Sequence, residues 1–228
     1  MSGLYHDVGV VLRTYKLRES DKIVVVHTRD HGKVRAVAKG VRKTRSRFGA
    51  RLEPMSHVKL LLYQGRELDI VSQAEAIEPL SPMLSSLDRA SQGLAALEAV
   101  DQLSLERESN PQLYKMLVGV LRTIASKPSP LNVPAFYWKL LAREGFRPQL
   151  HNCVRCHEAE PSVSLVAFDL NEGGVLCRSC RSGQAISPAA LGLLRDILGG
   201  RLQHALDQEE SPATHEVSSL ATKALEFQ

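Results

Sequence analysis

Two cysteine pairs set the strongest limit on how this chain can fold. Cys153 and Cys156 form one CxxC motif, Cys177 and Cys180 form a second, and twenty residues separate the pairs. These four residues are all the cysteines in the chain. Each CxxC can turn so that both sulfur atoms reach one tetrahedral ion at about 2.3 Å. The spacing therefore predicts a structural Zn²⁺ site, one per chain, inside a module over residues 145–185.

Three alternative roles for the cysteines fit the sequence less well. The string from Cys153 to His157 matches a c-type haem attachment motif, but the second pair lacks the histidine and no export signal is present. A thioredoxin-like redox site needs only one pair. His157 could replace one thiolate, although four thiolates suffice. Four protein ligands leave no open position for water, which favours a structural ion over a catalytic one.

The basic residues beside the cysteines have a simple electrostatic role. Four thiolates on Zn²⁺ leave two excess negative charges. We expect the neighbouring guanidinium groups to offset that charge, so these arginines need not contact DNA. They are Arg155, Arg178 and Arg181.

The pattern of apolar residues changes near residue 80 of this 228-residue chain. Before that point, short apolar or alternating segments are separated by turn residues, which is typical of β-strands. The expected strands are Val8–Leu12, Lys22–His27, Lys33–Lys39, Met55–Tyr63 and Leu68–Ile77. Five strands favour an OB-type β-barrel over residues 1–80, because closure hides strand edges that would otherwise be exposed. A small five-stranded sandwich is the alternative.

After residue 80 the apolar residues recur every three or four positions, as they do in amphipathic helices. Helices are expected over residues 84–103, 111–124, 133–143, 187–198 and 217–225. Such spacing predicts a packed helical core and not a cofactor pocket. The predicted fold class is therefore α+β, with the barrel followed by a helical domain over residues 81–228 that contains the cysteine module.

A basic stretch from Lys33 to Arg51 contains no acidic residue. Its eight like charges repel one another and cannot all be buried, so a polyanion would stabilise them most. Alternation along the third strand places its cations on the outer face, and the others follow in a loop. Phe48 in that loop could stack on a base. The candidate DNA-binding residues are Lys33, Arg35, Lys39, Arg42, Lys43, Arg45, Arg47 and Arg51.

The distribution of charge supports nucleic acid over the alternative of a solvated basic loop. Residues 1–80 contain 15 Lys and Arg against 9 Asp and Glu, whereas the remaining residues contain 14 against 16. The excess positive charge thus lies on the predicted barrel. Cations on the helices are expected to be ordinary solvent-facing residues. They are Arg89, Arg107, Lys115 and Arg122.

Several classes of protein lack support in the sequence. No run of about 18 apolar residues and no secretory signal is present, so we expect a cytoplasmic protein without a membrane partner. Acidic residues are scattered, and no DxD, HExxH or glycine-rich phosphate loop occurs. We therefore expect a protein that is not an enzyme. A metal-dependent DNA-processing enzyme and a zinc-ribbon scaffold that binds only protein remain the alternatives.

Several short segments, taken in order and spacing, resemble one protein family across almost the whole chain. They are Val11–Tyr15 with Glu19, Asp21 and Thr28; Ala38–Arg42 with Ser46, Leu52 and Pro54; Gly145–Pro148; and Gly173–Gly174 before Cys177. The chain resembles the RecO family of bacterial DNA repair proteins in these segments. The resemblance implies an N-terminal OB domain, a helical domain, and a zinc-binding module that only some members retain.

The resemblance also implies a function and a set of partners. It implies a recombination mediator, associated with the nucleoid, that binds single- and double-stranded DNA and anneals DNA strands. The implied protein partners are RecR and the acidic C-terminal tail of single-strand-binding protein. RecA is an indirect partner, because the mediator helps it to displace single-strand-binding protein. No motif in the sequence identifies the residues that would contact that tail.

Overall fold

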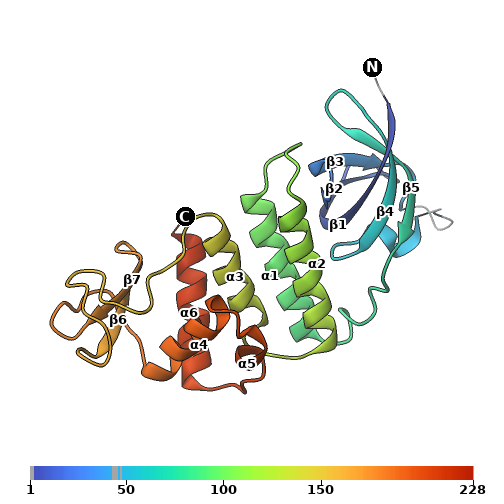
Figure 1. Cartoon of the computed structure of the whole chain (residues 1–228). Coiled ribbons are helices and arrows are strands. Elements are labelled where there is room, and N and C mark those ends of the chain that lie inside the picture. The colour runs from blue at the N-terminus through green and yellow to red at the C-terminus, as the bar shows by residue number, and fades with distance from the viewer. Residues whose placement is uncertain (1–2, 43–45, 47, 228) are drawn as a thin grey trace. The chain divides into compact units, whose positions relative to one another are not determined.

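The computed structural model describes residues 3–42, 46 and 48–227. They form two compact units, Met1–Lys127 and Pro128–Gln228, and Figure 1 shows their helices and strands. The first unit contains five strands and two long helices. The predicted boundary at residue 80 therefore separates strands from helices inside that unit.

The strands of the first unit close into a barrel. They are β1 (Leu4–Lys16), β2 (Lys22–Thr28), β3 (Gly32–Ala38), β4 (His57–Tyr63) and β5 (Asp69–Ala76). Their order around the barrel is β1-β2-β3-β5-β4, which confirms the predicted five-stranded barrel. β1 is longer than predicted, and a bulge between Val11 and Arg13 bends it so that it pairs with both β2 and β4.

The barrel interior is filled by alternate residues of the strands and closed by the loop after β3. Val24, Ala36 and Leu60 are among the buried residues of this core. A short 3₁₀-helix, η1 (Gly49–Leu52), adds Leu52 to it. Phe48, just before η1, is only 1% exposed and belongs to the same core. The prediction that Phe48 stacks on a base is therefore wrong, because an apolar ring gains more from filling the barrel than from contact with water.

Two helices pack on the outside of the barrel. They are α1 (Leu87–Leu103) and α2 (Pro111–Ser126), and both contact β1. The Ser86 side chain accepts a hydrogen bond from the Arg89 N–H and caps α1, and Asn110 caps α2 in the same way just before Pro111. The predicted helices over residues 84–103 and 111–124 are therefore confirmed to within a few residues.

The second unit contains a small sheet that lies to one side of a group of helices (Figure 1). Its elements are α3 (Asn132–Arg143), β6 (Leu165–Asp169), β7 (Gly174–Cys177), β8 (Gln184–Ala185), α4 (Pro188–Leu198), α5 (Leu202–Leu206) and α6 (Pro212–Glu226). The sheet order is β7-β6-β8. Trp138 of α3 meets Phe168 of β6 edge to face, with ring centroids 5.8 Å apart. This contact joins the helices and the sheet in one core, which also includes Cys153 and Cys177.

A buried carboxylate lies where β3 and β5 complete the barrel. Asp69 is fully buried, and its side chain accepts hydrogen bonds from Arg107 Nη2 at 2.7 Å, from the Gly65 N–H at 3.0 Å and from the Tyr5 hydroxyl. Burial alone would raise the pKa of Asp69, but the bonds from Arg107 and Tyr5 outweigh it and lower the pKa. Burial and this carboxylate together raise the pKa of the Tyr5 hydroxyl.

The Asp69→Asn variant tests whether this carboxylate stabilises the barrel. We expect a loss of about 2 kcal/mol in the free energy of unfolding at pH 7, because hydrogen bonds to a charged group are lost inside the protein. The Asp69 pKa is depressed in the folded chain, so its contribution is present above the unfolded value of about 3.9 and disappears as the pH falls below it. Urea unfolding at pH 7 and pH 3 measures both effects.

Asp30→Asn is the matched control for that experiment. Asp30 is exposed and pairs with the adjacent Arg29, so its loss should change the unfolding free energy by less than about 0.5 kcal/mol. Equal effects of the two substitutions at pH 7 would show that the Asp69 carboxylate does not stabilise the barrel.

Candidate nucleic-acid surface and metal centre

β3 presents its side chains as the alternation predicted. Val34, Ala36 and Ala38 are buried, whereas Lys33 and Arg35 lie on the outer side of the strand. The reason is the strand period of two, which turns every second side chain toward the barrel core. Lys39 follows the strand and is exposed. The outer face of β3 is therefore basic.

The first two of these cations have protein partners. Lys33 Nζ donates to the Asp101 main-chain oxygen at 2.6 Å and lies 3.1 Å from its carboxylate, and the side chain is only 14% exposed. Burial lowers the pKa of Lys33. Arg35 lies 3.7 Å from the Glu106 carboxylate but keeps 44% of its side chain exposed. Arg35 is thus the more accessible of the two for a phosphate.

The loop after β3 holds the remaining predicted cations. Arg42 is exposed, and its Nη1 donates to the Glu19 main-chain oxygen at 3.0 Å, which orients the guanidinium without neutralising it. Arg51 lies exposed in η1. Three other predicted residues lie outside the described part of the chain. They are Lys43, Arg45 and Arg47.

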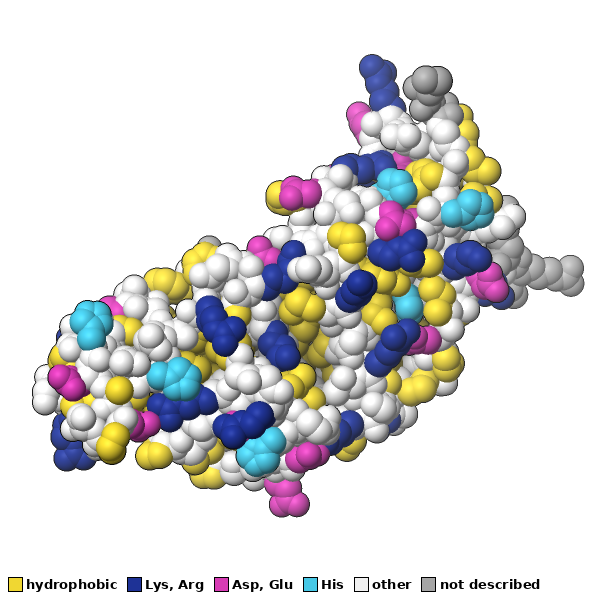
Figure 2. Space-filling view, viewed as in Figure 1, with side chains coloured by type: hydrophobic (Ala, Val, Ile, Leu, Met, Phe, Trp, Pro, Cys, Tyr) yellow, Lys and Arg dark blue, Asp and Glu magenta, His cyan; other side chains and the backbone are white. Residues whose placement is uncertain are grey.

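The strand pairing reveals a cation that sequence reasoning did not single out. Arg13 on β1 pairs through Val25 of β2 with Arg35 of β3, so all three side chains lie on one outer face. Arg13 also bonds the buried Asp101 carboxylate, yet 52% of its side chain is exposed. Period-two alternation could not identify it, because the bulge at Val11 and Arg13 shifts the alternation of β1 by one residue. In Figure 2, Lys and Arg side chains appear on the visible face of both units.

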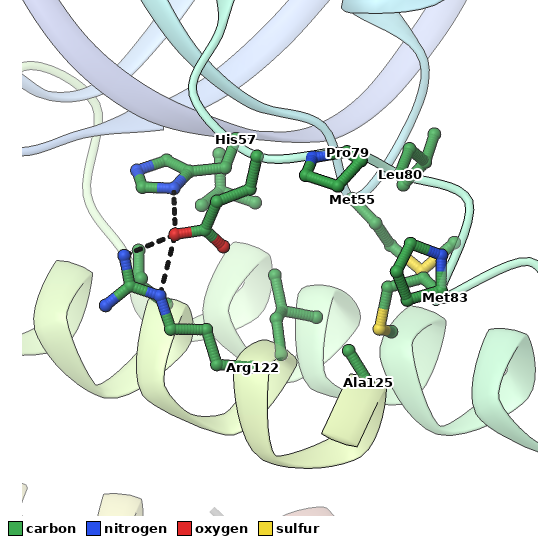
Figure 3. Close-up of a pocket in the computed structure, with 12 residues that line it drawn as sticks. Met55, His57, Pro79, Leu80, Met83, Arg122 and Ala125 are labelled. Atoms are coloured by element: carbon green, nitrogen blue, oxygen red, sulfur yellow. Dashed lines mark hydrogen bonds and ion pairs between the residues drawn. The ribbon is translucent and has the colours of Figure 1, made fainter.

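A small groove lies between the barrel and α2 inside the first unit. It has a volume of about 180 Å³, and its lining includes Met55, Met83 and Val118. Arg122 of α2 and His57 of β4 both contact the Glu78 carboxylate, and Figure 3 marks these interactions with dashed lines. The lining residues are therefore mostly apolar, with one ionic cluster.

The ionic cluster of the groove is internally neutralised. Arg122 Nε donates to Glu78 at 2.7 Å, and this bond lowers the pKa of the Glu78 carboxyl. Burial lowers the pKa of His57, whose Nε2 is 2.7 Å from the Tyr114 hydroxyl. Because its carboxylate already has a cationic partner, the groove is suited to packing apolar groups and poorly suited to proton transfer.

The four cysteines converge in the second unit. Their sulfur atoms all lie within 4.8 Å of one another, and the Cys156 and Cys177 sulfurs are 3.8 Å apart. Tetrahedral ligation at about 2.3 Å places sulfur atoms about 3.8 Å apart, so the geometry fits a Zn²⁺-sized ion. His157 is not a member of this group. Within the described residues, the cysteines are the one cluster of three or more Cys, His, Asp and Glu side chains placed to hold a metal.

The surroundings of the cysteines move the pKa values of their thiols in opposite directions. Burial raises the pKa of the Cys153 thiol, but backbone N–H groups of Cys156, Cys177 and Arg155 outweigh it and lower the pKa to about 6. The neighbouring Cys177 side chain and burial raise the pKa of Cys180 to about 12. One thiolate is thus stable on its own, and four together require a cation at their centre.

Arg155 links the loop of the first CxxC pair to the loop of the second by hydrogen bonds. Its Nη1 donates to the Cys180 main-chain oxygen at 2.9 Å, and its Nη2 donates to the Ser182 hydroxyl at 2.9 Å. The same guanidinium also forms an ion pair with the Glu172 carboxylate, which partly neutralises its positive charge. Arg178 and Arg181 are exposed beside the ligands. The expectation that all three arginines offset the charge of the cluster stays a prediction.

Cys177→Ser tests the metal centre. We expect the wild-type chain to contain one bound metal ion and the variant to contain almost none, because three thiolates hold the ion far more weakly. The variant should also unfold at a temperature several degrees lower, since Cys177 lies in the core of the second unit. Elemental analysis of the dialysed protein and calorimetry provide the two readouts.

Ser179→Ala is the control, because Ser179 is exposed between two ligands and supplies no sulfur. It should leave the metal content and the unfolding temperature unchanged. A Cys177→Ser chain that keeps a full equivalent of metal would rule out the four-thiolate site. Elemental analysis also identifies the metal.

No helix in the described residues has both the length and the apolar composition needed to cross a bilayer.

Comparison with known proteins identifies the family of this chain. Residues 1–80 match the family model "Recombination protein O N terminal", and residues 84–223 match "Recombination protein O C terminal". The chain is 43% identical over 203 residues to the DNA repair protein RecO of Nocardioides sp., covering 86% of this chain and 83% of that protein. It is 44% identical over 204 residues to the DNA repair protein RecO of Bifidobacterium longum subsp. infantis, with the same coverage. With both family models matched along nearly its whole length, the chain belongs to the RecO family.

Proposed function

We propose that this chain is a DNA repair protein that binds and anneals DNA as a recombination mediator. The observation that carries the proposal is the row of accessible cations at the end of β3, on a closed five-stranded barrel of a RecO-family chain. Arg35, Lys39 and Arg42 are exposed there, and no carboxylate lies within 4.0 Å of the Lys39 or Arg42 side-chain nitrogens among the described residues. In this proposal residues 1–80 are the DNA-binding domain and residues 81–228 are the helical domain.

The proposed activity needs no covalent chemistry. Cations that neutralise phosphates on two complementary strands reduce the repulsion between the strands, and base pairing then drives annealing. We propose that the chain is not an enzyme and that its four cysteines hold a structural Zn²⁺. The names of the two relatives, both DNA repair proteins, support a role in repair.

Family membership supports the proposed partners. In this proposal the chain works with RecR, contacts the acidic C-terminal tail of single-strand-binding protein, and helps RecA to replace that protein on single strands. The site of action is the cytoplasm, at the nucleoid. Annealing of complementary strands coated with single-strand-binding protein, with and without its acidic tail, tests the contact with the tail. Equal rates in both cases would contradict it.

A salt titration tests the charge-based part of the proposal. With four phosphate contacts, a plot of log affinity against log salt has a slope of about −3 for a single strand, which corresponds to a loss of about 50-fold between 50 and 200 mM salt. We expect Lys39→Glu with Arg42→Glu to reduce that slope by about 1.5 and to weaken binding at low salt. Fluorescence anisotropy with a labelled oligonucleotide measures both quantities.

Lys59→Glu with Arg66→Glu is the matched control for the loss of charge. It changes the net charge by the same amount on the same barrel, but on β4 and the turn that follows it. We expect it to retain the wild-type slope. A wild-type affinity that does not change with salt, or equal effects of the two double variants, would contradict a binding surface at the end of β3.

A metal-dependent DNA-processing enzyme is the other candidate class. Incubation of labelled single and double strands with the protein and Mg²⁺ or Mn²⁺ separates the two classes. Intact DNA together with faster annealing supports the mediator, and cut DNA supports the enzyme. A zinc-ribbon scaffold that binds only protein would show neither DNA binding nor cutting.

A further inference from the structure

An apolar row crosses the outer face of the barrel beside the cations. Tyr15 of β1 pairs with Ile23 of β2, and Ile23 pairs with Val37 of β3. Directly paired residues project on the same side of a sheet, so these three side chains form one continuous row. The inward positions next to them are Thr14, Val24 and Ala36, and the last two are fully buried in the core.

The row is accessible to solvent. Tyr15 is 45% exposed, and Ile23 and Val37 are half-buried. Leu17, two residues beyond Tyr15 and just after the end of β1, is also exposed. The neighbouring outward-facing row consists of Arg13, Val25 and Arg35, and Val25 at its centre is buried. The described part of the first unit therefore covers one outward row and leaves the next one open.

Cations flank this open row on both sides. Arg13 and Arg35 occupy the two ends of the neighbouring row, and both side chains are about half exposed despite their acidic partners. Lys39 lies two residues beyond Val37, on the other side of the row. The Arg13 guanidinium carbon lies over the Tyr15 ring, 5.9 Å from its centroid, which places a cation directly beside the aromatic surface.

This arrangement matches the chemistry of a single strand. Phosphates need the cations, and the faces of unpaired bases gain from contact with an aromatic or aliphatic surface. In a duplex the base faces are stacked on one another inside the helix and cannot reach such a row. We propose that the Tyr15–Ile23–Val37 row is a base-stacking surface, which makes this chain prefer single-stranded over double-stranded DNA. The proposal rests on the DNA-binding function proposed above and assigns the bases, as well as the phosphates, as ligands of that surface.

Tyr15→Ala tests the stacking surface directly. We expect it to weaken binding of a thymidine 30-mer about tenfold, which is the scale of one lost base stack. It should leave unchanged the binding of a duplex of equal length and of an abasic 30-mer, because neither presents base faces to the row. Tyr15→Phe keeps the ring and should bind like the wild type, which separates stacking from a folding defect. Phe146→Ala removes an exposed aromatic residue of the second unit and serves as the control.

Crosslinking gives an independent readout. Ultraviolet irradiation of the wild-type protein with a 5-iodouracil oligonucleotide, followed by peptide mass spectrometry, should place a crosslink at Tyr15. Equal affinity of the wild type for the thymidine and abasic strands, or an unchanged affinity of Tyr15→Ala for the thymidine strand, would overturn the stacking proposal while leaving the phosphate-binding proposal intact. Absence of binding to every DNA would overturn the proposed function itself.

Discussion

Closure of the barrel between β3 and β5 is the constraint on which the rest of the first unit depends. The two strands pair over only two positions, Ala36 with Asp69 and Val37 with Ile70. So short a parallel pairing contributes little by itself. The buried Asp69 carboxylate adds hydrogen bonds from Tyr5 of β1 and from Arg107, beyond α1, at this same point. Without closure, β3 would be an edge strand with unpaired backbone groups along one side.

The helix α1 decides which basic residues of the barrel remain available to a ligand. Asp101 near its end bonds both Arg13 and Lys33, and its carboxylate is buried. Lys33 is largely covered as a result, whereas Arg13 extends past the carboxylate and stays half exposed. A buried carboxylate needs a cationic partner, and the nearest strands supply two. The surface open to phosphates is therefore shifted from the start of β3 toward its end.

The cysteine module depends on the core around it as much as on its four sulfurs. Cys153 and Cys177 are buried with Trp138, Phe168 and the helices of the second unit, while Cys156 is exposed. The metal-binding loops thus emerge from a packed core, which positions the backbone N–H groups that lower the pKa of Cys153. A metal at this site would join loops that the core already holds close together. That arrangement is consistent with a structural role, because all four ligand positions are supplied by the protein.

The pattern of residues along the chain was sufficient to predict much of the fold and part of the candidate site. The change of apolar period near residue 80 separated the five barrel strands from the helices α1 and α2, the CxxC pairs located the cysteine cluster, and alternation gave the outer face of β3. These features are local, since they depend on residues a few positions apart. Predictions that needed long-range partners were less complete: α5 and β8 were not foreseen, and Phe48 turned out to be buried.

The tertiary structure determined which partners these side chains contact and which of them remain exposed. The sequence could show that Lys33 and Arg35 share a strand face, but only folding brings Asp101 and Glu106, about 70 residues away, against them. In the same way, the row of Tyr15, Ile23 and Val37 exists only because three strands pair in one register, across a bulge that the sequence does not mark. The sequence by itself determined the five barrel strands, the longer helices and the four residues that can hold a metal. Strand pairing and burial depend on contacts between segments that are far apart in the sequence. They determined which charged side chains and aromatic rings remain on the surface.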